Sequence, residues 1–475
     1  MKTKTKILLS AMTLTMLSIT VPAEPIPLYD HSYRSFNAGR HYQLLTPQIS
    51  ELWDVHNITM QFSNRYYYSK DTALVNNRWL FHFADSINFH NLDFNFRIRL
   101  DSPGWRVRDA GWSSERAGEK NDPGFVYDPD RIVAHYTSSS ERFRFGFGKD
   151  RYNWGPLELG GLLLSDYNEG FSGFYQQYTL GSFVLRGLTT QLNSMRLDQT
   201  GITHRYFSAS RLEYYKPAYG LAFGQSMIYT GLWRSWDIRY FFPFYIFHYA
   251  QMTAGGDHGY GNAGQNSMGS LDGYMKIYRL PLEVYGELLV DDFQGHSDEV
   301  SQSRQNTVSW MLGLRLKSAD PWYGFVEGGK VSTYSYNHAI VPKRYMINNS
   351  FIGSPLGPDQ QLLWGKFGRA FYNDNLKADL NFWLRRSGER HGRDTLFTIP
   401  DASLNGTRGD KQPFGTVEDE LSLWGSVKHH GYFVDVEARS GMTLYRNRGN
   451  EESGWARYPF FGIFLSTGLS VRAER

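Results

Sequence analysis

Residues 92–100 read Leu-Asp-Phe-Asn-Phe-Arg-Ile-Arg-Leu, so apolar and polar residues alternate without interruption. Successive side chains of a β-strand point to opposite faces, and this stretch therefore predicts a strand with one apolar and one polar face. Such strands occur in antiparallel sandwiches of water-soluble proteins and in barrels that stand in lipid around a watery lumen. The remainder of the chain decides between these two architectures.

The same alternation recurs along the whole chain. It is clearest at 142–148, 308–316, 376–385 and 461–472, and the last of these is expected to be the closing strand. Weaker stretches bring the expected number of strands to the middle or high teens. These weaker strand predictions are Ile58–Ser63, Trp79–Phe83, Ile132–Tyr136, Tyr178–Leu188, Tyr206–Tyr214, Leu221–Tyr229, Tyr274–Tyr278, Leu282–Val290, Tyr323–Thr333, Leu421–Val427 and Tyr432–Ala438.

The N-terminus has the pattern of an export signal. Lysines at positions 2, 4 and 6 precede an apolar stretch at 7–21, and small residues follow, so cleavage is expected after Ala23. The alternative is a transmembrane anchor, which this short, threonine-rich stretch fits less well. We therefore expect an exported protein.

The composition narrows the class further. Without the three signal lysines, 47 basic residues face 47 acidic ones, so the mature chain has no net charge that would favour nucleic acid. The most apolar later window, Tyr240–Tyr249, has only about ten residues and contains Pro243, too short for a membrane helix. Aromatic residues make up 16% although the chain is polar on average, as expected when lipid-facing and lumen-facing residues alternate.

The chain has no cysteine, which excludes disulfides and thiolate chemistry. A closed barrel does not need such cross-links, because each strand has two hydrogen-bonded neighbours. Together these features predict an all-β fold, a large antiparallel transmembrane β-barrel of about 16–18 strands. The outer membrane of a Gram-negative cell is its expected location.

Five connections are too long for the loops of a compact sandwich and are expected to be binding loops or inward plugs. Short turns such as 216–220 and 429–431 join other neighbours, as in a meander. We divide the chain into a signal peptide (1–23), a periplasmic lead-in (24–55) and one barrel (56–475). The five long connections are Asp101–Asp130, Asp150–Phe174, Gly231–Ser270, Asn337–Trp364 and Ser387–Glu418.

No motif predicts catalysis, a cofactor or a metal. The Gly-x-Gly-x-x-Gly spacing at 259–264 lacks the strand–helix context of a dinucleotide site and indicates a flexible loop. His429 and His430 lie in a turn, and no His–Glu spacing suits zinc. Asp291 and Asp292 could act on glycosides, but solvated hairpin acids are the commoner interpretation.

The most distinctive block begins with Phe147-Gly148-Lys149-Asp150-Arg151-Tyr152-Asn153-Trp154-Gly155-Pro156 and continues through residues 160–166. With the blocks at 211–214, 221–225, 239–244 and 351–359, it resembles the Wzi-type capsule assembly family of outer-membrane barrels. The resemblance covers the middle of the chain well and its ends poorly.

This resemblance implies a barrel of about eighteen strands, plugged by inward loops and by a small helical element on the periplasmic side. It also implies a non-enzymatic role in which capsular polysaccharide is bound at the cell surface. The implied partners are capsular or other surface polysaccharide, outer-membrane lipid and lipopolysaccharide, and the barrel insertion machinery.

Residues on the long connections offer flat aromatic faces for sugar rings, with polar groups for hydroxyls and carboxylates. The alternative for each is structural: a tight turn wedging a plug loop, or packing in an interface girdle. The candidate polysaccharide-binding residues are Trp154, Asp166, Asn168, Trp233, Trp236, Asp237 and Arg239.

We predict a barrel that binds surface polysaccharide and supports capsule assembly without covalent chemistry. The first alternative is a diffusion porin, which would have the same strands and conduct steadily in planar bilayers. The second is a barrel hydrolase acting on lipid A or glycan, which would need an acid/base set or nucleophile that spacing does not reveal.

Overall fold

A computed structural model describes residues 55–474 with several gaps. The leader and lead-in predicted for residues 1–54 thus lie outside the described residues. The gaps are 70–73, 90, 102–125, 169, 199–200, 233, 249–263, 278–279, 293–306, 317–320, 339–340, 348–349, 372–374, 390–411 and 432–433.

The described elements are strands and three short 3-10 helices. The strands are β1 (Val55–Ser69), β2 (Leu74–Phe89), β3 (Leu92–Asp101), β4 (Val126–Thr137), β5 (Phe143–Asp150), β6 (Phe171–Leu180), β7 (Phe183–Gln191), β8 (Met195–Asp198), β9 (Gly201–Tyr215), β10 (Tyr219–Gly231), β11 (Gly264–Ile277), β12 (Leu282–Asp292), β13 (Thr307–Leu316), β14 (Trp322–Val331), β15 (Met346–Ile347), β16 (Ser350–Phe351), β17 (Gln360–Phe371), β18 (Leu376–Ser387), β19 (Glu418–His430), β20 (Asp435–Arg446) and β21 (Ala456–Glu474). The helices are η2 (Ile238–Phe241), η4 (Val341–Lys343) and η5 (Arg448–Asn450).

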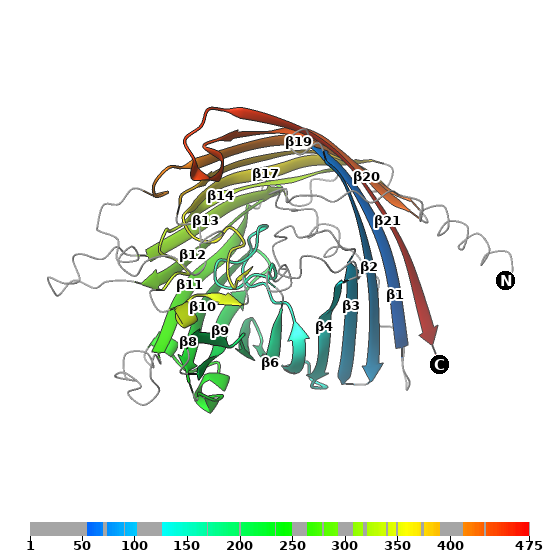
Figure 1. Cartoon of the computed structure of the whole chain (residues 1–475). Helices are drawn as coiled ribbons and strands as arrows, with labels where there is room; N and C mark the ends of the chain where they lie inside the picture. The colour runs from blue at the N-terminus through cyan, green and yellow to red at the C-terminus, as the bar shows by residue number, and fades with distance from the viewer. Residues whose placement is uncertain are drawn as a thin grey trace.

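Eighteen of these strands form an antiparallel ring (Figure 1). Each pairs with its neighbours in chain order, with β7 beside β9 and β14 beside β17, and β21 pairs with β1 along its length. Strand β8 pairs only with the first residues of β9, and β15 pairs only with β16, so these three strands are not part of the ring. The fold is therefore all-β and antiparallel with the expected number of strands, and β21 is the closing strand that the sequence predicts.

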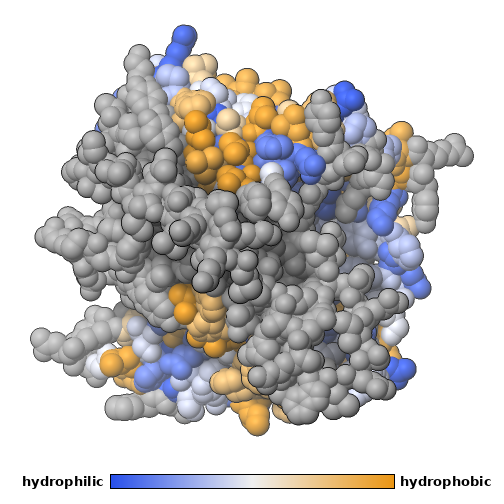
Figure 2. All heavy atoms as spheres, turned by 90° about the vertical axis from the view of Figure 1, so that its right-hand side faces the viewer, coloured by the Kyte–Doolittle hydropathy of each residue, from blue (hydrophilic) through white to orange (hydrophobic). Residues whose placement is uncertain are grey.

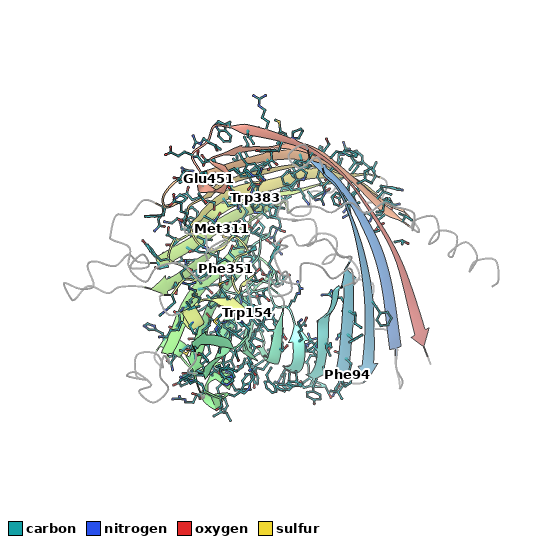
Figure 3. The ribbon with its side chains drawn as sticks, in the orientation of Figure 1. Phe94, Trp154, Met311, Phe351, Trp383 and Glu451 are labelled. Atoms are coloured by element: carbon teal, nitrogen blue, oxygen red, sulfur yellow. The ribbon has the colours of Figure 1, made fainter. Side chains whose placement is uncertain are left out.

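Side chains alternate between the outer wall and the interior as the sequence predicts. Phe94 on β3, Trp310 on β13 and Leu380 on β18 are exposed, whereas Met311 on β13 and Trp383 on β18 are buried. Figure 3 shows Met311 and Trp383 on the barrel wall and Phe94 at its periphery. On the face seen in Figure 2, apolar residues gather in patches beside hydrophilic ones.

One end of the ring has short turns and the other has long connections. Turns of two to five residues join β2–β3, β4–β5, β6–β7, β9–β10, β11–β12, β13–β14, β17–β18 and β19–β20 at the first end, where β1 begins and β21 ends. All five predicted long connections lie at the second end. We call these the short-turn end and the long-loop end.

One strand prediction is wrong. The stretch 178–188 is not a single strand but the hairpin between β6 and β7, which turns at Gly181 and Ser182. Gly181 has a positive φ of 59°, which glycine adopts without the steric cost that a side chain brings. Apolar residues on both sides of this two-residue turn hide it in the sequence pattern.

Two connections fold back into the lumen and fill it with a plug (Figure 1). The first plug segment is 151–170, between β5 and β6, and the second is 332–359, between β14 and β17. Their apolar side chains form one cluster with inward side chains of the wall. Buried members of this cluster from the plug are Trp154, Leu157, Leu159, Leu162, Leu163, Leu164, Tyr336, Tyr345, Ile347, Ile352 and Leu356.

Two wall carboxylates hold the first plug segment through its backbone. Glu327 on β14 accepts hydrogen bonds from the amides of Glu158 and Leu159, at 2.7 and 3.3 Å. Glu287 on β12 accepts from the amides of Leu162 and Leu163, at 2.8 and 3.0 Å. Both carboxyl groups are buried, and a buried amide without a partner carries a desolvation cost, so these four bonds fix the segment in the lumen.

The second plug segment is hydrogen-bonded to the first segment and to the wall. The hydroxyls of Tyr336 and Tyr345 donate to the carbonyls of Leu162 and Leu163, at 2.6 and 2.8 Å. On β9, the guanidinium of the fully buried Arg205 donates to three backbone carbonyls of this segment, at 2.7–2.9 Å. The inward plugs that the sequence predicts are therefore built as one unit.

The expected helical element on the periplasmic side is not among the described residues of the short-turn end. The helices η2, η4 and η5 all lie on connections at the long-loop end. None of the helices in the described part of the chain has the length and apolar character to cross a membrane.

Candidate functional site: a cavity inside the barrel

A cavity of about 500 Å³ lies inside the barrel. The inner faces of β6, β7 and β9–β13 form its wall, and residues 151–156 of the first plug segment cover it. Its wall includes the last residue of β9 and the second residues of β10 and β12, so it lies on the short-turn side of the plug.

Four tyrosines present rings to this cavity. Tyr152 from the plug stacks on Tyr175 of β6, with ring centroids 5.1 Å apart and an interplanar angle of 12°. Tyr215 of β9 stacks on Tyr274 of β11 at 6.3 Å. Burial raises the pKa of Tyr152, and the nearby Asp150 raises it further, so this phenol stays neutral and remains a hydrogen-bond donor.

The cavity has more cationic than anionic side chains. Five cationic side chains and three carboxylates line it, and a fourth carboxylate, Glu158, pairs with Arg315 at 2.6 Å. The cations are Arg151, Arg186, Arg211, Arg315 and Lys276, and the carboxylates are Glu213, Asp272 and Glu283.

Most of these charges are tied into the wall. Arg211 donates from Nε to Glu213 at 2.7 Å and from Nη2 to Asp272 at 2.7 Å, and all three side chains are buried. Arg186 approaches the same Glu213 at 3.1 Å, and Arg315 bonds Glu283 at 3.0 Å. Buried charges need such partners, because an unpaired one carries a large desolvation cost. This network therefore shapes the cavity wall, while the exposed Lys276 is free to approach a ligand.

Such a cavity suits a sugar chain. Aromatic faces cover the apolar faces of sugar rings, and phenols and cations bind hydroxyls and carboxylates. The described residues contain no cluster of three or more His, Asp or Glu side chains that could hold a metal ion.

The predicted residues of the first plug segment lie around this cavity or close to it. Trp154 borders the cavity but buries its ring in the plug cluster, and its amide bonds the Leu164 carbonyl at 2.9 Å. Asn168 is fully buried and bonds the backbone of Ser165 and Gly170, which closes a tight turn. The Asp166 carbonyl accepts from Arg151 at 3.4 Å. The geometry of Trp154 and Asn168 favours the structural alternative for both.

The remaining predicted residues lie elsewhere. Trp233 is outside the described residues. Trp236, Asp237 and Arg239 belong to the β10–β11 connection, and Trp236 packs on Phe174, whose neighbour Phe147 is exposed on the outer wall. The structure therefore does not bring them to the cavity.

Asp237 and Arg239 pair with each other. The Asp237 carboxylate caps η2 by accepting from the Arg239 amide, and it bonds the Arg239 guanidinium at 2.6 Å. Partial burial opposes ionisation of Asp237, but the hydrogen bonds from Arg239 outweigh it and lower the pKa of this carboxyl. The pair stabilises the turn at the start of η2.

The sequence analysis missed Tyr274 and Lys276 as site residues. Both occupy inward positions of β11, whose outward neighbours Leu271 and Met275 are exposed. The alternation of β11 was the available signal, but the sequence pattern recognised only its last residues as a strand. Tyr152 was visible only as part of the block that contains Trp154.

Comparison with solved structures finds outer-membrane barrels of similar fold. Wzi of Escherichia coli, an outer-membrane protein involved in group 1 capsule assembly and described as a carbohydrate-binding β-barrel, matches with a TM-score of 0.57 and 13% identity over 86% of this chain and 84% of Wzi. OprD of Pseudomonas aeruginosa matches with a TM-score of 0.45 and 10% identity over 88% and 95% of the two chains. OccK10 of the same organism gives 0.47 and 11% over 88% and 99%.

The similarity to Wzi shows a shared barrel fold. No protein-family profile and no curated protein matches this chain by sequence.

Proposed function

We propose that this protein is an outer-membrane barrel that binds an acidic surface polysaccharide in its lumenal cavity and takes part in capsule assembly. The observation that carries the proposal is the cavity itself, with its stacked tyrosines and its excess of cationic side chains. The carbohydrate binding described for Wzi supports the same class of ligand.

The plug favours binding over diffusion. Strand carboxylates hold the first plug segment at four backbone amides, and the second segment covers it. A diffusion porin needs an open lumen, whereas a binding protein needs a rigid cavity wall. Short turns face the periplasm in bacterial outer-membrane barrels, so a glycan would reach this cavity from the periplasmic side.

Titration of the purified full chain with acidic capsular oligosaccharides tests the binding role. We expect saturable binding, and we expect Lys276→Ala to weaken it about tenfold, because a hydrogen bond to a charged group contributes about 1.5 kcal/mol. Calorimetry at low and high salt measures both values, and the loss should shrink as salt screens the charge.

Lys216→Ala is the matched control, because Lys216 lies at the same end of the barrel, in the β9–β10 turn, and does not line the cavity. Its affinity should equal that of the wild type. Equal losses in both variants, or no binding by the wild type, would contradict the proposal.

In cells, deletion of the gene should release capsule into the medium, and unchanged cell-attached capsule would argue against the assembly role.

A further inference from the structure

Part of the β10–β11 connection lies on the outside of the barrel. We call residues 234–248 the outer strap. Phe244 of the strap packs against Tyr178, and Phe241 against Phe174, and both partners are outward residues of β6. A Cβ atom on Gly187 of β7 would lie 3.2 Å from Pro243, so the strap is in close contact with the wall.

The outer wall beneath the strap also carries polar side chains. Gln176, Thr189, Gln225 and Gln265 occupy outward positions on β6, β7, β10 and β11, in line with exposed apolar residues of the same strands. Each of them bonds the strap. Gln176 donates to the Phe241 carbonyl, Thr189 to the Tyr240 carbonyl, Gln225 to the Tyr245 carbonyl, and Gln265 to the Tyr240 hydroxyl.

These contacts give part of the strap backbone partners in the protein. The Phe247 amide donates to Gln225 at 3.0 Å, and the amides of Tyr240, Phe242 and Tyr245 donate to carbonyls within the strap. Backbone polar groups without partners carry a large cost in hydrocarbon. These hydrogen bonds therefore lower the cost of placing residues 240–247 against lipid.

The strap exposes four apolar side chains, beside the exposed polar residues Ser235, Arg239 and His248. Ile238, Phe242, Phe244 and Ile246 are 73%, 61%, 75% and 64% exposed, whereas Tyr240 and Phe247 point to the wall and are buried. We call these four exposed side chains the ridge. Phe223, 55% exposed on β10, continues the apolar surface along the wall below it.

We propose that the ridge lies among the lipid acyl chains around the barrel, so that the strap is a membrane-embedded collar over β6–β11. This inference rests on the outer-membrane location in the proposed function. Lipid is the occupant that fits, because the ridge continues a barrel wall that acyl chains cover on either side. A ridge of four side chains is also narrow compared with the roughly 800 Å² per partner of a stable protein interface.

Brominated lipids test the location of the ridge. The chain has no cysteine, so a single introduced cysteine can carry an environment-sensitive fluorophore. We expect Phe244→Cys, labelled in the full-length protein and reconstituted in vesicles, to be quenched strongly by lipids brominated on their acyl chains and weakly by aqueous iodide. Ile246→Cys gives the same test at a second position if the first variant does not fold.

Two controls separate failure of this inference from failure of the membrane location. Leu221→Cys, on the exposed outer wall of β10, should be quenched by the brominated lipids. Glu451→Cys, exposed on the β20–β21 connection, should respond to iodide instead. If the ridge labels follow Glu451 while Leu221 is quenched, the collar is wrong. If Leu221 also escapes quenching, the membrane location is wrong. Ridge labels shielded from both quenchers would indicate a second protein copy and overturn the proposal.

Discussion

At the scale of single residues, the plug depends on backbone contacts that leave no space for a side chain. Gly161 lies where the chain turns back on itself, and a Cβ atom there would clash with the carbonyl oxygens of Trp154 and Leu164. Gly353 of the second plug segment is placed in the same way against the Leu162 carbonyl. These two glycines allow the two plug segments to approach at backbone distance.

We predict that Gly161→Ala weakens the closure of the first plug segment by about 1–3 kcal/mol, the usual cost of overpacking. Hydrogen exchange of the Trp154 amide, which bonds Leu164, measures the change as faster exchange. Gly454→Ala is the control, because a Cβ atom there meets nothing within 4 Å. Equal protection of Trp154 in both variants would show that the turn does not depend on Gly161.

The residue scale also shows which site predictions the sequence could support. The sequence marks the block around Trp154 as distinctive, and that block does form the plug segment that covers the cavity. It could not reveal the bonds from Glu287 to Leu162 and Leu163, because these partners are more than 120 positions apart in the chain. Alternation says that a side chain points inward, but not which loop it meets.

At the scale of elements, strict alternation predicted the strands well. The stretches containing Leu92–Leu100, Val308–Leu316 and Leu376–Leu384 are all strands. Their residues alternate strictly because the surroundings of the wall are apolar on one face and polar on the other. Prediction failed where that contrast is lost. β17 begins at Gln360, inside a stretch expected to be a loop, and its first outward residue, Gln361, is polar.

The stability of the docked second plug segment should depend on pH. Burial, and next the charges of Lys343 and Arg344, lower the pKa of His338 to about 4 from its usual 6.5. The folded segment thus holds His338 neutral, whereas the released segment binds a proton below pH 6.5. The docked state is therefore fully favoured above pH 6.5 and loses stability as the pH falls towards 4.

We predict that protection of the Tyr345 amide, which bonds the Tyr336 carbonyl, falls relative to that of His338→Gln as the pH decreases from 7 to 4.5. The variant has no group that titrates at this position. Hydrogen exchange of both proteins at each pH gives the ratio, in which the intrinsic pH dependence of exchange cancels. A ratio that stays constant across this range would contradict the role of His338.

At the scale of the whole molecule, the ring and its filling have different origins in the sequence. The eighteen paired strands follow from periodicity, and the number expected from that periodicity agrees with the ring. The filling follows from loops that return into the lumen and meet buried carboxylates on β12 and β14. A filled lumen that holds a cationic, aromatic cavity would distinguish a binding barrel from an open channel.

Ion conductance in planar bilayers tests this claim most directly. We predict that the wild-type protein shows no large steady single-channel current, and that Glu287→Ala combined with Glu327→Ala opens it. Each carboxyl group accepts two plug amides, and each such bond contributes about 0.5–1.5 kcal/mol. Glu451→Ala, at an exposed loop position, should stay closed like the wild type. Large steady currents through the wild-type barrel would contradict the account.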